Sequence, residues 1–189
     1  MEFERFLADP VSRRRFFHSA GVAAGGGSAA FLAACGGSSK SKNETSAAAD
    51  VAILNSAIDL ENTAIAAYTA GAPFLKGEVL RRGREFLGQE KGHADTLSTA
   101  VSHLGGHPTR PKASYDFPRV RNQRDVLLLA SMIENRAIAA YLDALPKLSS
   151  PDLRATVASI VTTEAEHASV LLGALGRPQV PSAFVVGRR

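Results

Sequence analysis

Two stretches of this chain repeat one arrangement of glutamate, tyrosine and histidine residues. In each copy a glutamate precedes a tyrosine by seven positions, and a Glu-x-x-His sequence follows after a gap of 21 or 22 residues. Corresponding glutamates of the two copies lie 73 or 74 positions apart. Agreement in both residue type and spacing indicates an internal duplication. The first copy consists of Glu61, Tyr68, Glu90 and His93, and the second of Glu134, Tyr141, Glu164 and His167.

The repeated glutamates and histidines suit a pair of metal ions if the segments that carry them are helical. Residues three positions apart share one face of an α-helix, so Glu-x-x-His can present a carboxylate and an imidazole to one first-row transition metal. Glu61 and Glu134 stand in stretches rich in alanine, isoleucine and leucine, where a lone charge is costly to bury. Four such helices would bring four carboxylates and two imidazoles together, which is the ligand set of a dinuclear site in a helix bundle.

Charge favours the same interpretation. Four glutamates in one small volume cannot all stay ionised without compensation, because burial and like charges both raise carboxyl pKa values. Two divalent cations would neutralise them. Without metal, we expect the cluster to take up protons or to hydrogen-bond to the two histidines. The structural alternative, two buried Glu–His pairs with no metal, is disfavoured by the matched spacing of both sets.

The repeated tyrosines allow two interpretations. Tyr68 and Tyr141 lie two helical turns after their glutamates and on the same face. Each is either a core aromatic with a satisfied hydroxyl, or the donor of a hydrogen bond that orients a ligand carboxylate on a neighbouring helix. Asn62 and Asn135 also repeat, but they turn away from the preceding glutamate by about 100°, which favours polar contacts at the helix surface or between helices.

The doubled pattern resembles the signature of the ferritin-like superfamily, notably rubrerythrins and bacterioferritins, over roughly residues 46–176. The resemblance implies a di-iron centre that reacts with dioxygen or peroxide. The sequence has no downstream four-cysteine iron domain of the rubrerythrin type, and its first 35 residues resemble an export signal, which cytosolic cage ferritins lack. Carried onto this sequence, the resemblance implies six metal ligands: Glu61, Glu90, His93, Glu134, Glu164 and His167.

The first 35 residues resemble an export signal rather than part of a fold. Residues 12–17 read Ser-Arg-Arg-Arg-Phe-Phe, with Arg13 and Arg14 as the twin arginines, and residues 32–36 read Leu-Ala-Ala-Cys-Gly, like a lipoprotein cleavage site. The resemblance implies export by the twin-arginine machinery, a lipid on Cys35 and tethering to the outer side of the cytoplasmic membrane. In the alternative, cleavage near Ala34 leaves Cys35 as a free thiol. As the only cysteine, Cys35 can form no internal disulfide.

The rest of the sequence predicts an all-α fold. Residues 36–49 are small and polar, which is typical of a flexible linker. Residues 106–122 contain three prolines and can span about 55 Å, more than the length of a bundle of about 30 Å. We therefore predict a ferritin-like four-helix bundle in which this segment crosses from the second to the third helix, so that these two helices run parallel. Helices are expected over residues 50–70 (with a start as early as Ser46), 77–104, 122–145 and 151–176, followed by a tail over 177–189.

Composition and charge exclude one class of partner. The formal net charge is +4, and no basic run is interleaved with aromatic residues, so nucleic-acid binding is not expected. The basic cluster of Arg81, Arg82 and Arg84 is typical of a solvated helix face. Glu166, His103 and His107 fall outside the repeated pattern, and we expect them to be exposed.

These observations favour a membrane-tethered di-iron oxidoreductase of the ferroxidase or peroxidase type, acting with O2 or H2O2. Its cofactor would be two metal ions, iron in the first place and manganese as the alternative, and no acid–base residue separate from the ligands is evident. A non-catalytic metal-binding or stress-protective protein is the second hypothesis. Cage-type iron storage fits poorly with a lipid on every subunit. The sequence leaves the oligomeric state open, with a homodimer as one option.

Overall fold

The computed structural model describes residues 39–187, and every regular element within that range is a helix. The long helices are α3 (Ser39–Gly71), α4 (Gly77–His103), α5 (Gln123–Ala144) and α6 (Pro151–Ala174), and the short 3-10 helices η1 (Ala72–Phe74) and η2 (Leu145–Lys147) lie in two of the turns. The predicted all-α four-helix bundle is therefore confirmed. The predicted signal peptide, with Arg13, Arg14 and Cys35, lies outside the described residues.

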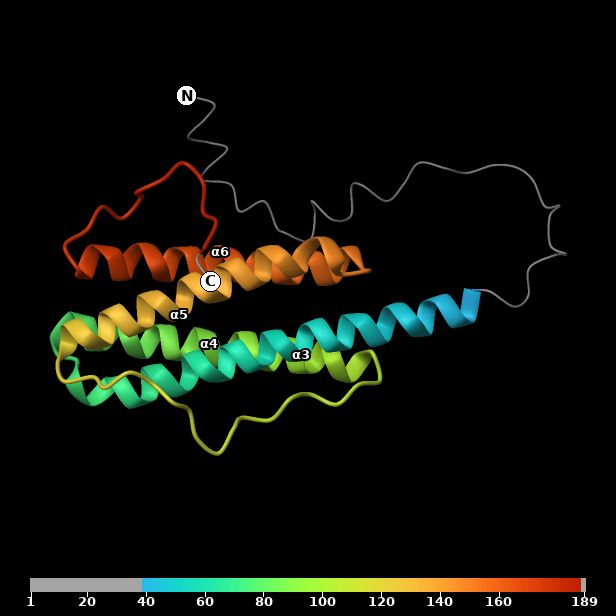
Figure 1. The fold of residues 1–189 in the computed structure, drawn as a ribbon, viewed down its shortest axis with the longest axis horizontal. Helices are drawn as coiled ribbons and strands as arrows, with labels where there is room; N and C mark the ends of the chain where they lie inside the picture. The colour runs from blue at the N-terminus through green and yellow to red at the C-terminus, as the bar shows by residue number, and fades with distance from the viewer. Residues whose placement is uncertain (1–38, 188–189) are drawn as a thin grey trace, which may run out of the picture. The chain divides into compact units, whose positions relative to one another are not determined.

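The long connection between α4 and α5 crosses the bundle as predicted. Short turns join α3 to α4 and α5 to α6, whereas residues 104–122 return along the bundle, so that α4 and α5 run in the same direction (Figure 1). The crossing segment is bound to α3. The Asn55 side chain donates to the carbonyl of His107 (3.1 Å) and accepts from the amide of Thr109 (2.7 Å), and Lys112 pairs with Asp59 at 2.8 Å.

Side-chain caps fix where α5 and α6 begin. The side chain of Asn122 accepts a hydrogen bond from the amide of Asp125 at 3.0 Å and thereby caps α5. The Ser150 hydroxyl accepts from the amides of Asp152 and Leu153, and Pro151 occupies the first helical position.

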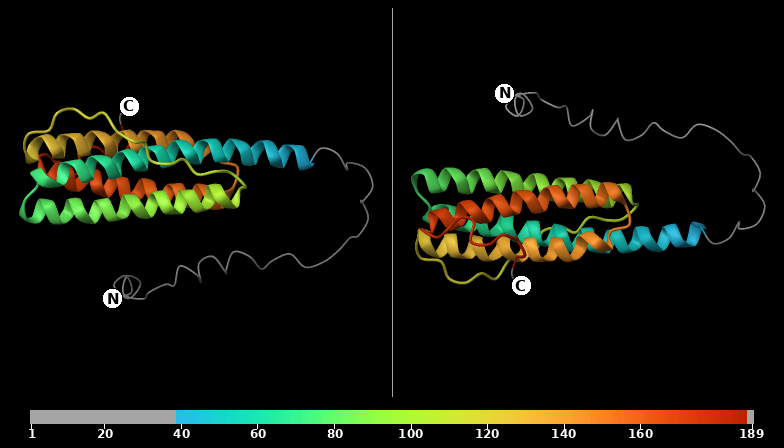
Figure 2. Two further views of the ribbon diagram at one scale, coloured as in Figure 1. Left: turned by 90° about the horizontal axis from the view of Figure 1, so that it is seen from below. Right: turned by 90° about the horizontal axis from the view of Figure 1, so that it is seen from above.

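Helix α3 begins earlier than the sequence suggested. The flexible linker predicted over residues 36–49 is helical from Ser39 onward, and this part of α3 extends beyond the end of the bundle (Figure 2). The physical reason is local. No glycine or proline occurs between residues 38 and 70, and three consecutive alanines precede Asp50. Alanine, lysine and glutamate favour the helix even without a packed face, whereas the linker was predicted from the small, polar side chains of this segment.

Two apolar clusters fill the bundle, and the predicted ligands lie between them along the helices. One cluster includes Leu54, Ile58, Leu97, Val101, Leu148, Val157 and Ile160. The other includes Phe86, Leu127, Leu129, Ile133, Leu171 and Leu175. Among residues 39–187, none of the helices combines the length and apolar composition of a membrane span.

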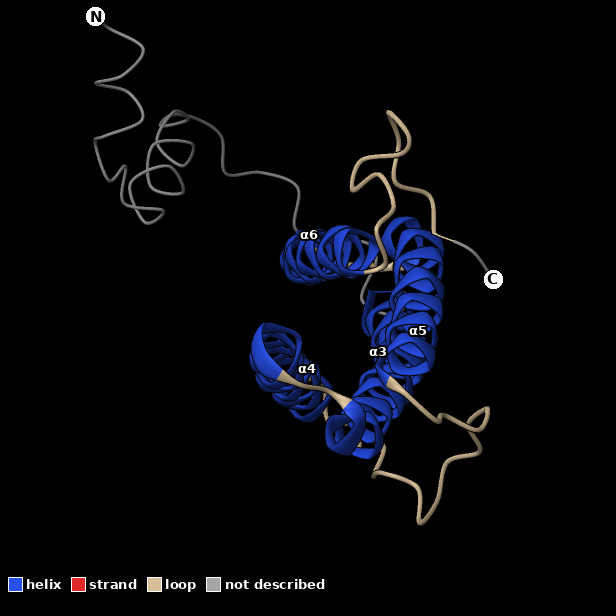
Figure 3. Ribbon diagram, turned by 90° about the vertical axis from the view of Figure 1, so that its left-hand side faces the viewer, coloured by secondary structure: helices blue, strands red, loops and turns tan. Residues whose placement is uncertain are grey.

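The four long helices do not pack equally closely. α3 packs along α4, α5 packs along α6, and α3 also contacts α5, whereas α4 and α6 make few contacts with each other. Figure 3, an end-on view, shows α4 and α6 set apart on the side opposite to α3 and α5.

The C-terminal tail returns to α5. Gly187 has a positive φ of 65°, and a Cβ atom there would lie 2.4 Å from the amide nitrogen of Ala139 and 2.5 Å from the carbonyl oxygen of Asn135. Glycine thus permits this contact, which lies along α5 rather than at an end of the bundle. Val180 and Phe184 of the tail stay exposed.

Candidate metal centre

All six predicted ligands meet inside the bundle. Glu61 comes from α3, Glu90 and His93 from α4, Glu134 from α5, and Glu164 and His167 from α6. Five of the six are at most 1% exposed, while the side chain of His93 is 13% exposed.

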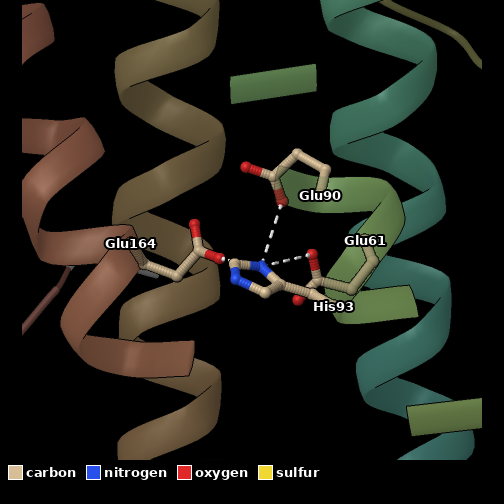
Figure 4. Close-up of side chains that lie close together, drawn as sticks. All are labelled: Glu61, Glu90, His93 and Glu164. Atoms are coloured by element: carbon tan, nitrogen blue, oxygen red, sulfur yellow. Dashed lines mark ion pairs between the residues drawn. The ribbon is translucent and has the colours of Figure 1, made fainter. Parts of the chain in front are cut away.

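His93 lies among three carboxylates. Its Nδ1 atom is 3.0 Å from Oε1 of Glu164, 3.5 Å from Oε2 of Glu61 and 3.8 Å from Oε2 of Glu90. Figure 4 shows the ring directed into the space between these side chains. Ligand atoms of these four residues all lie within 4.8 Å of one another.

His167 lies in an equivalent environment, which is also made by three carboxyl groups. Its Nδ1 atom is 3.0 Å from Oε1 of Glu90, 3.5 Å from Oε1 of Glu134 and 3.7 Å from Oε2 of Glu164. These four residues also bring ligand atoms within 4.8 Å of one another. Glu90 and Glu164 therefore belong to both groups, and the two groups share one centre.

The donor atoms of this centre fit a metal. Within the described part of the chain, the Nδ1 atoms of His93 and His167 make no hydrogen bond of acceptable geometry, and neither do buried oxygens of Glu90, Glu134 and Glu164. Buried polar atoms normally have hydrogen-bond partners. A cluster of nitrogen and carboxylate oxygen atoms without such partners therefore indicates that a metal ion is the missing partner. Imidazole and carboxylate together suit first-row transition metals.

Each tyrosine of the repeated pattern hydrogen-bonds to the glutamate of the other repeat. The hydroxyl of Tyr68 donates to Oε1 of Glu134, and the hydroxyl of Tyr141 donates to Oε1 of Glu61. Burial and the neighbouring carboxylates hold both tyrosine pKa values well above the ordinary 10, so each hydroxyl keeps its proton and remains a donor. Of the two interpretations of the tyrosines, the structure supports a hydrogen bond to a carboxylate on a neighbouring helix.

The four carboxyl groups divide into two kinds. Burial raises the pKa of Glu61 to about 8 and that of Glu134 well above its usual value, so both hold protons near neutral pH. Burial also acts to raise the pKa of Glu90, but the two imidazoles and Glu61 outweigh it and lower the pKa. For Glu164 burial is likewise outweighed, here by Glu134 and the two imidazoles, and the pKa falls.

The histidines take up protons as well. Burial acts to lower the pKa of each imidazole, but the surrounding carboxylates outweigh it and raise the pKa of His93 to about 12 and that of His167 to about 11. Two imidazolium ions thus face two carboxylates, Glu90 and Glu164, and the metal-free cluster is neutral overall. The directions of these pKa shifts agree with the expectation that, without metal, carboxyl groups and imidazoles of the cluster take up protons.

Gln89 contacts a predicted ligand, although the repeated sequence pattern does not include it. Its Oε1 atom lies 2.6 Å from Nε2 of His167, so the amide oxygen accepts if that nitrogen carries the proton, and Nδ1 is then free to face the carboxylates. Phe86 stacks on the same ring at 4.1 Å between ring centroids. The duplication does not mark Gln89, because the corresponding residue in the second repeat is Thr163.

Residues expected outside the site lie outside it. Glu166, His103 and His107 are exposed, and Arg81 and Arg82 pair with Glu78 and Glu85 on the outer face of α4. Asn135 donates to the carbonyl of Ser131 at 2.7 Å. Asn62 differs from the expectation of a polar contact, because it is 7% exposed and its amide nitrogen has no partner among the described residues.

Residues 49–177, more than half of the chain, match the family described as "Ferritin-like domain". The chain belongs to this ferritin-like family. A search of the curated proteins found no match. Helices α4, α5 and α6 and the part of α3 from residue 49 onward, which includes Glu61, fall inside the matched range, so the whole candidate centre belongs to the ferritin-like domain.

Solved structures share the ferritin-like fold. A ferritin-like, diiron-carboxylate protein from Bacillus anthracis has a TM-score of 0.62 and 22% identity, covering 69% of this chain and 97% of its own. Rhodobacter capsulatus bacterioferritin, described with a metal-free dinuclear site and heme iron, has a TM-score of 0.61 and 25% identity, covering 68% and 84%. A conserved hypothetical protein from Mycobacterium tuberculosis has a TM-score of 0.64 and 23% identity, covering 67% and 97%.

Proposed function

We propose that this ferritin-like protein binds two metal ions, iron in the first place, and acts as an oxidoreductase that uses O2 or H2O2. The observation that carries the proposal is the pair of overlapping Glu/His groups with unpartnered donor atoms. Glu90 and Glu164, which belong to both groups, would help to hold both ions. Glu61 with His93 would complete one position, and Glu134 with His167 the other.

The protein side chains would set the charge and orientation of the centre. Bound iron would supply the electrons that reduce O2 or peroxide. Four carboxylates balance the charge of two divalent ions once Glu61, Glu134 and both imidazoles give up their protons. The hydroxyls of Tyr68 and Tyr141 would hold the carboxylates of Glu134 and Glu61 by one oxygen each, leaving the second oxygen of each for metal.

Iron is favoured over manganese by the similar structures and not by the donor set. Carboxylate-rich sites with two imidazoles accept both ions, so the donor set by itself does not choose. Two of the similar structures are a diiron-carboxylate protein and a bacterioferritin with heme iron and a dinuclear site. Metal analysis of protein from its native host would distinguish the two ions.

Export and tethering form the second part of the proposal. The twin arginines Arg13 and Arg14 and the cysteine at position 35 support export by the twin-arginine machinery, with a lipid that holds the protein on the outer side of the cytoplasmic membrane. Export of this kind carries proteins that are already folded. The metal would therefore enter the protein in the cytoplasm, before export. Cys35→Ser should release the protein from the membrane, whereas a wild-type protein found free in the soluble fraction would contradict the tether.

The competing proposal is that the protein binds metal without catalysing a reaction. The burial of five of the six predicted ligands favours it, since an oxidant needs access to the centre. Rapid oxidation of Fe(II), or removal of peroxide by the metal-loaded protein, would decide for the enzyme.

Metal stoichiometry tests the centre directly. The full-length protein should bind two ions per chain, and Glu164→Ala should remove at least one of them. The matched control is Glu166→Ala, which removes an exposed carboxylate from the same helix. A wild-type protein that binds neither Fe(II) nor Mn(II) would overturn the proposal, as would equal metal loss in the two variants.

A further inference from the structure

An apolar cavity of about 270 Å³ lies beside the candidate metal centre. It is lined by residues from the end of α3, the first half of α4, the start of α5 and the end of α6, and it is partly open to solvent. Phe86, Ala130 and Leu171 are among its apolar walls. Protein interiors rarely leave apolar space much larger than a water molecule, so a cavity of this size can accept a ligand.

Two residues in the wall connect the cavity to the centre. Tyr68 donates its hydrogen bond to Glu134, and Phe86 stacks on the imidazole of His167. A molecule in the cavity would therefore contact side chains that themselves contact two predicted ligands.

The cavity offers little to a charged molecule. Of its polar side chains, Tyr68 already uses its hydroxyl on Glu134, and Glu78 pairs with Arg82 at 3.2 Å. This pair lies at a solvent-exposed position on α4, with 62% and 43% of the two side chains exposed. A charged group inside would lose its hydration without gaining an unpaired partner.

We propose that this cavity binds a small, uncharged, apolar organic molecule against Tyr68 and Phe86. An apolar protein cavity of about 150 Å³ is large enough for benzene, so the space here accommodates a substituted aromatic ring. This ligand would be neither the metal nor the oxidant of the proposed function. Its binding does not require metal, so the two proposals can fail separately.

Toluene is a suitable probe, with benzoate as its charged counterpart. Ligand-detected NMR on the full-length, metal-free protein should show saturable binding of about one toluene per chain and binding of benzoate at least tenfold weaker. Failure of toluene to bind saturably, or equal binding of benzoate, would overturn the proposal.

Variants locate the binding. Ala174 lines the cavity and is exposed, so Ala174→Trp should cover the opening without disturbing the core and weaken toluene binding at least tenfold. Ala130→Phe should fill the cavity from the inside with the same result. The control is Ala158→Trp, at an exposed position of α6 outside the cavity lining, which should bind like the wild type. Undiminished binding in Ala174→Trp would place the ligand elsewhere, and an unchanged metal content in that variant would show that its centre is intact.

Discussion

Tyr141 on α5 donates a hydrogen bond to Glu61 on α3, a residue 80 positions earlier in the chain. Both side chains are at most 1% exposed. The bond joins the two repeats at the centre, and Tyr68 makes the reciprocal bond to Glu134. The carboxylates predicted to bind metal at the two ends of the centre are thus held by the opposite half of the chain.

The tyrosine bonds can be removed with little change in packing. Tyr141→Phe should leave a buried carboxyl oxygen of Glu61 without its donor, which costs about 1–3 kcal/mol of stability in the metal-free protein. Loss of a group that orients a ligand should also weaken metal binding about 10–100-fold. Thermal unfolding and metal titration measure the two effects. Tyr115→Phe is the control, because that tyrosine lies in the crossing segment and contacts Lys112. Metal affinity unchanged in Tyr141→Phe would refute an orienting role.

Gln89 should act on the His167 side of the centre. Gln89→Leu removes the acceptor at Nε2 of His167 and should weaken metal binding there about 10–100-fold, with no comparable effect at the His93 side. Gln89→Glu keeps an acceptor at the same place and should restore most of the affinity. Two-step metal titrations, followed by the spectrum of Co(II) as a probe ion, would show which step changes. Equal affinities for the leucine and glutamate variants would contradict the role.

Metal-free and metal-loaded protein should respond to pH in opposite directions. The pKa of Glu61 rises from 4.5 to about 8, and those of His93 and His167 rise from 6.5 to about 12 and about 11. Their stabilising contribution is complete below the unfolded pKa and is lost as pH rises toward the folded one. Metal-free protein should therefore lose stability as pH rises above about 4.5, through Glu61 up to about pH 8 and through both histidines from about pH 6.5 to about 11. Below about pH 4.5, the lowered pKa values of Glu90 and Glu164 reverse the trend.

Bound metal reverses the trend in the neutral range, because metal competes with the protons on the ligands and binds more tightly as pH rises. The difference in Tm between the two forms should grow from about pH 6 to 8, and metal loading should release protons into a weakly buffered solution. A Tm difference that is constant or shrinks with pH would contradict the assigned ligands.

Asp50 should support the fold without supporting the centre. This residue is 1% exposed, and its carboxylate accepts from the amide of Ser149 at 2.9 Å and from the Ser149 hydroxyl, which ties α3 to the turn between α5 and α6. Asp50→Ala should lower the free energy of unfolding by about 1–3 kcal/mol, because the Ser149 amide loses its partner. Metal stoichiometry should stay at the wild-type value. Chemical denaturation measures the first quantity and elemental analysis the second.

The bundle and the six clustered residues could be predicted because the duplication marks them twice. The i, i+3 spacing of Glu90 and His93 indicates that the two side chains share one face of a helix. The prolines between residues 106 and 122 rule out a helix in that segment. Gln89 could not be predicted, because its contact with His167 depends on how α4 and α6 face each other and has no counterpart in the second repeat. The helical start of α3 was missed because alanine-rich polar sequence carries helix propensity without a periodic pattern.

The reciprocal tyrosine bonds bear on how such a chain could have arisen. A polypeptide of half this length would contain one Glu-x6-Tyr and one Glu-x-x-His, and its tyrosine would have no glutamate of a second repeat to hold. Two such polypeptides associating about a twofold axis would supply the missing partners to each other. Duplication of the gene and fusion of the two copies would then place both halves in one chain. The association of the halves would no longer depend on protein concentration.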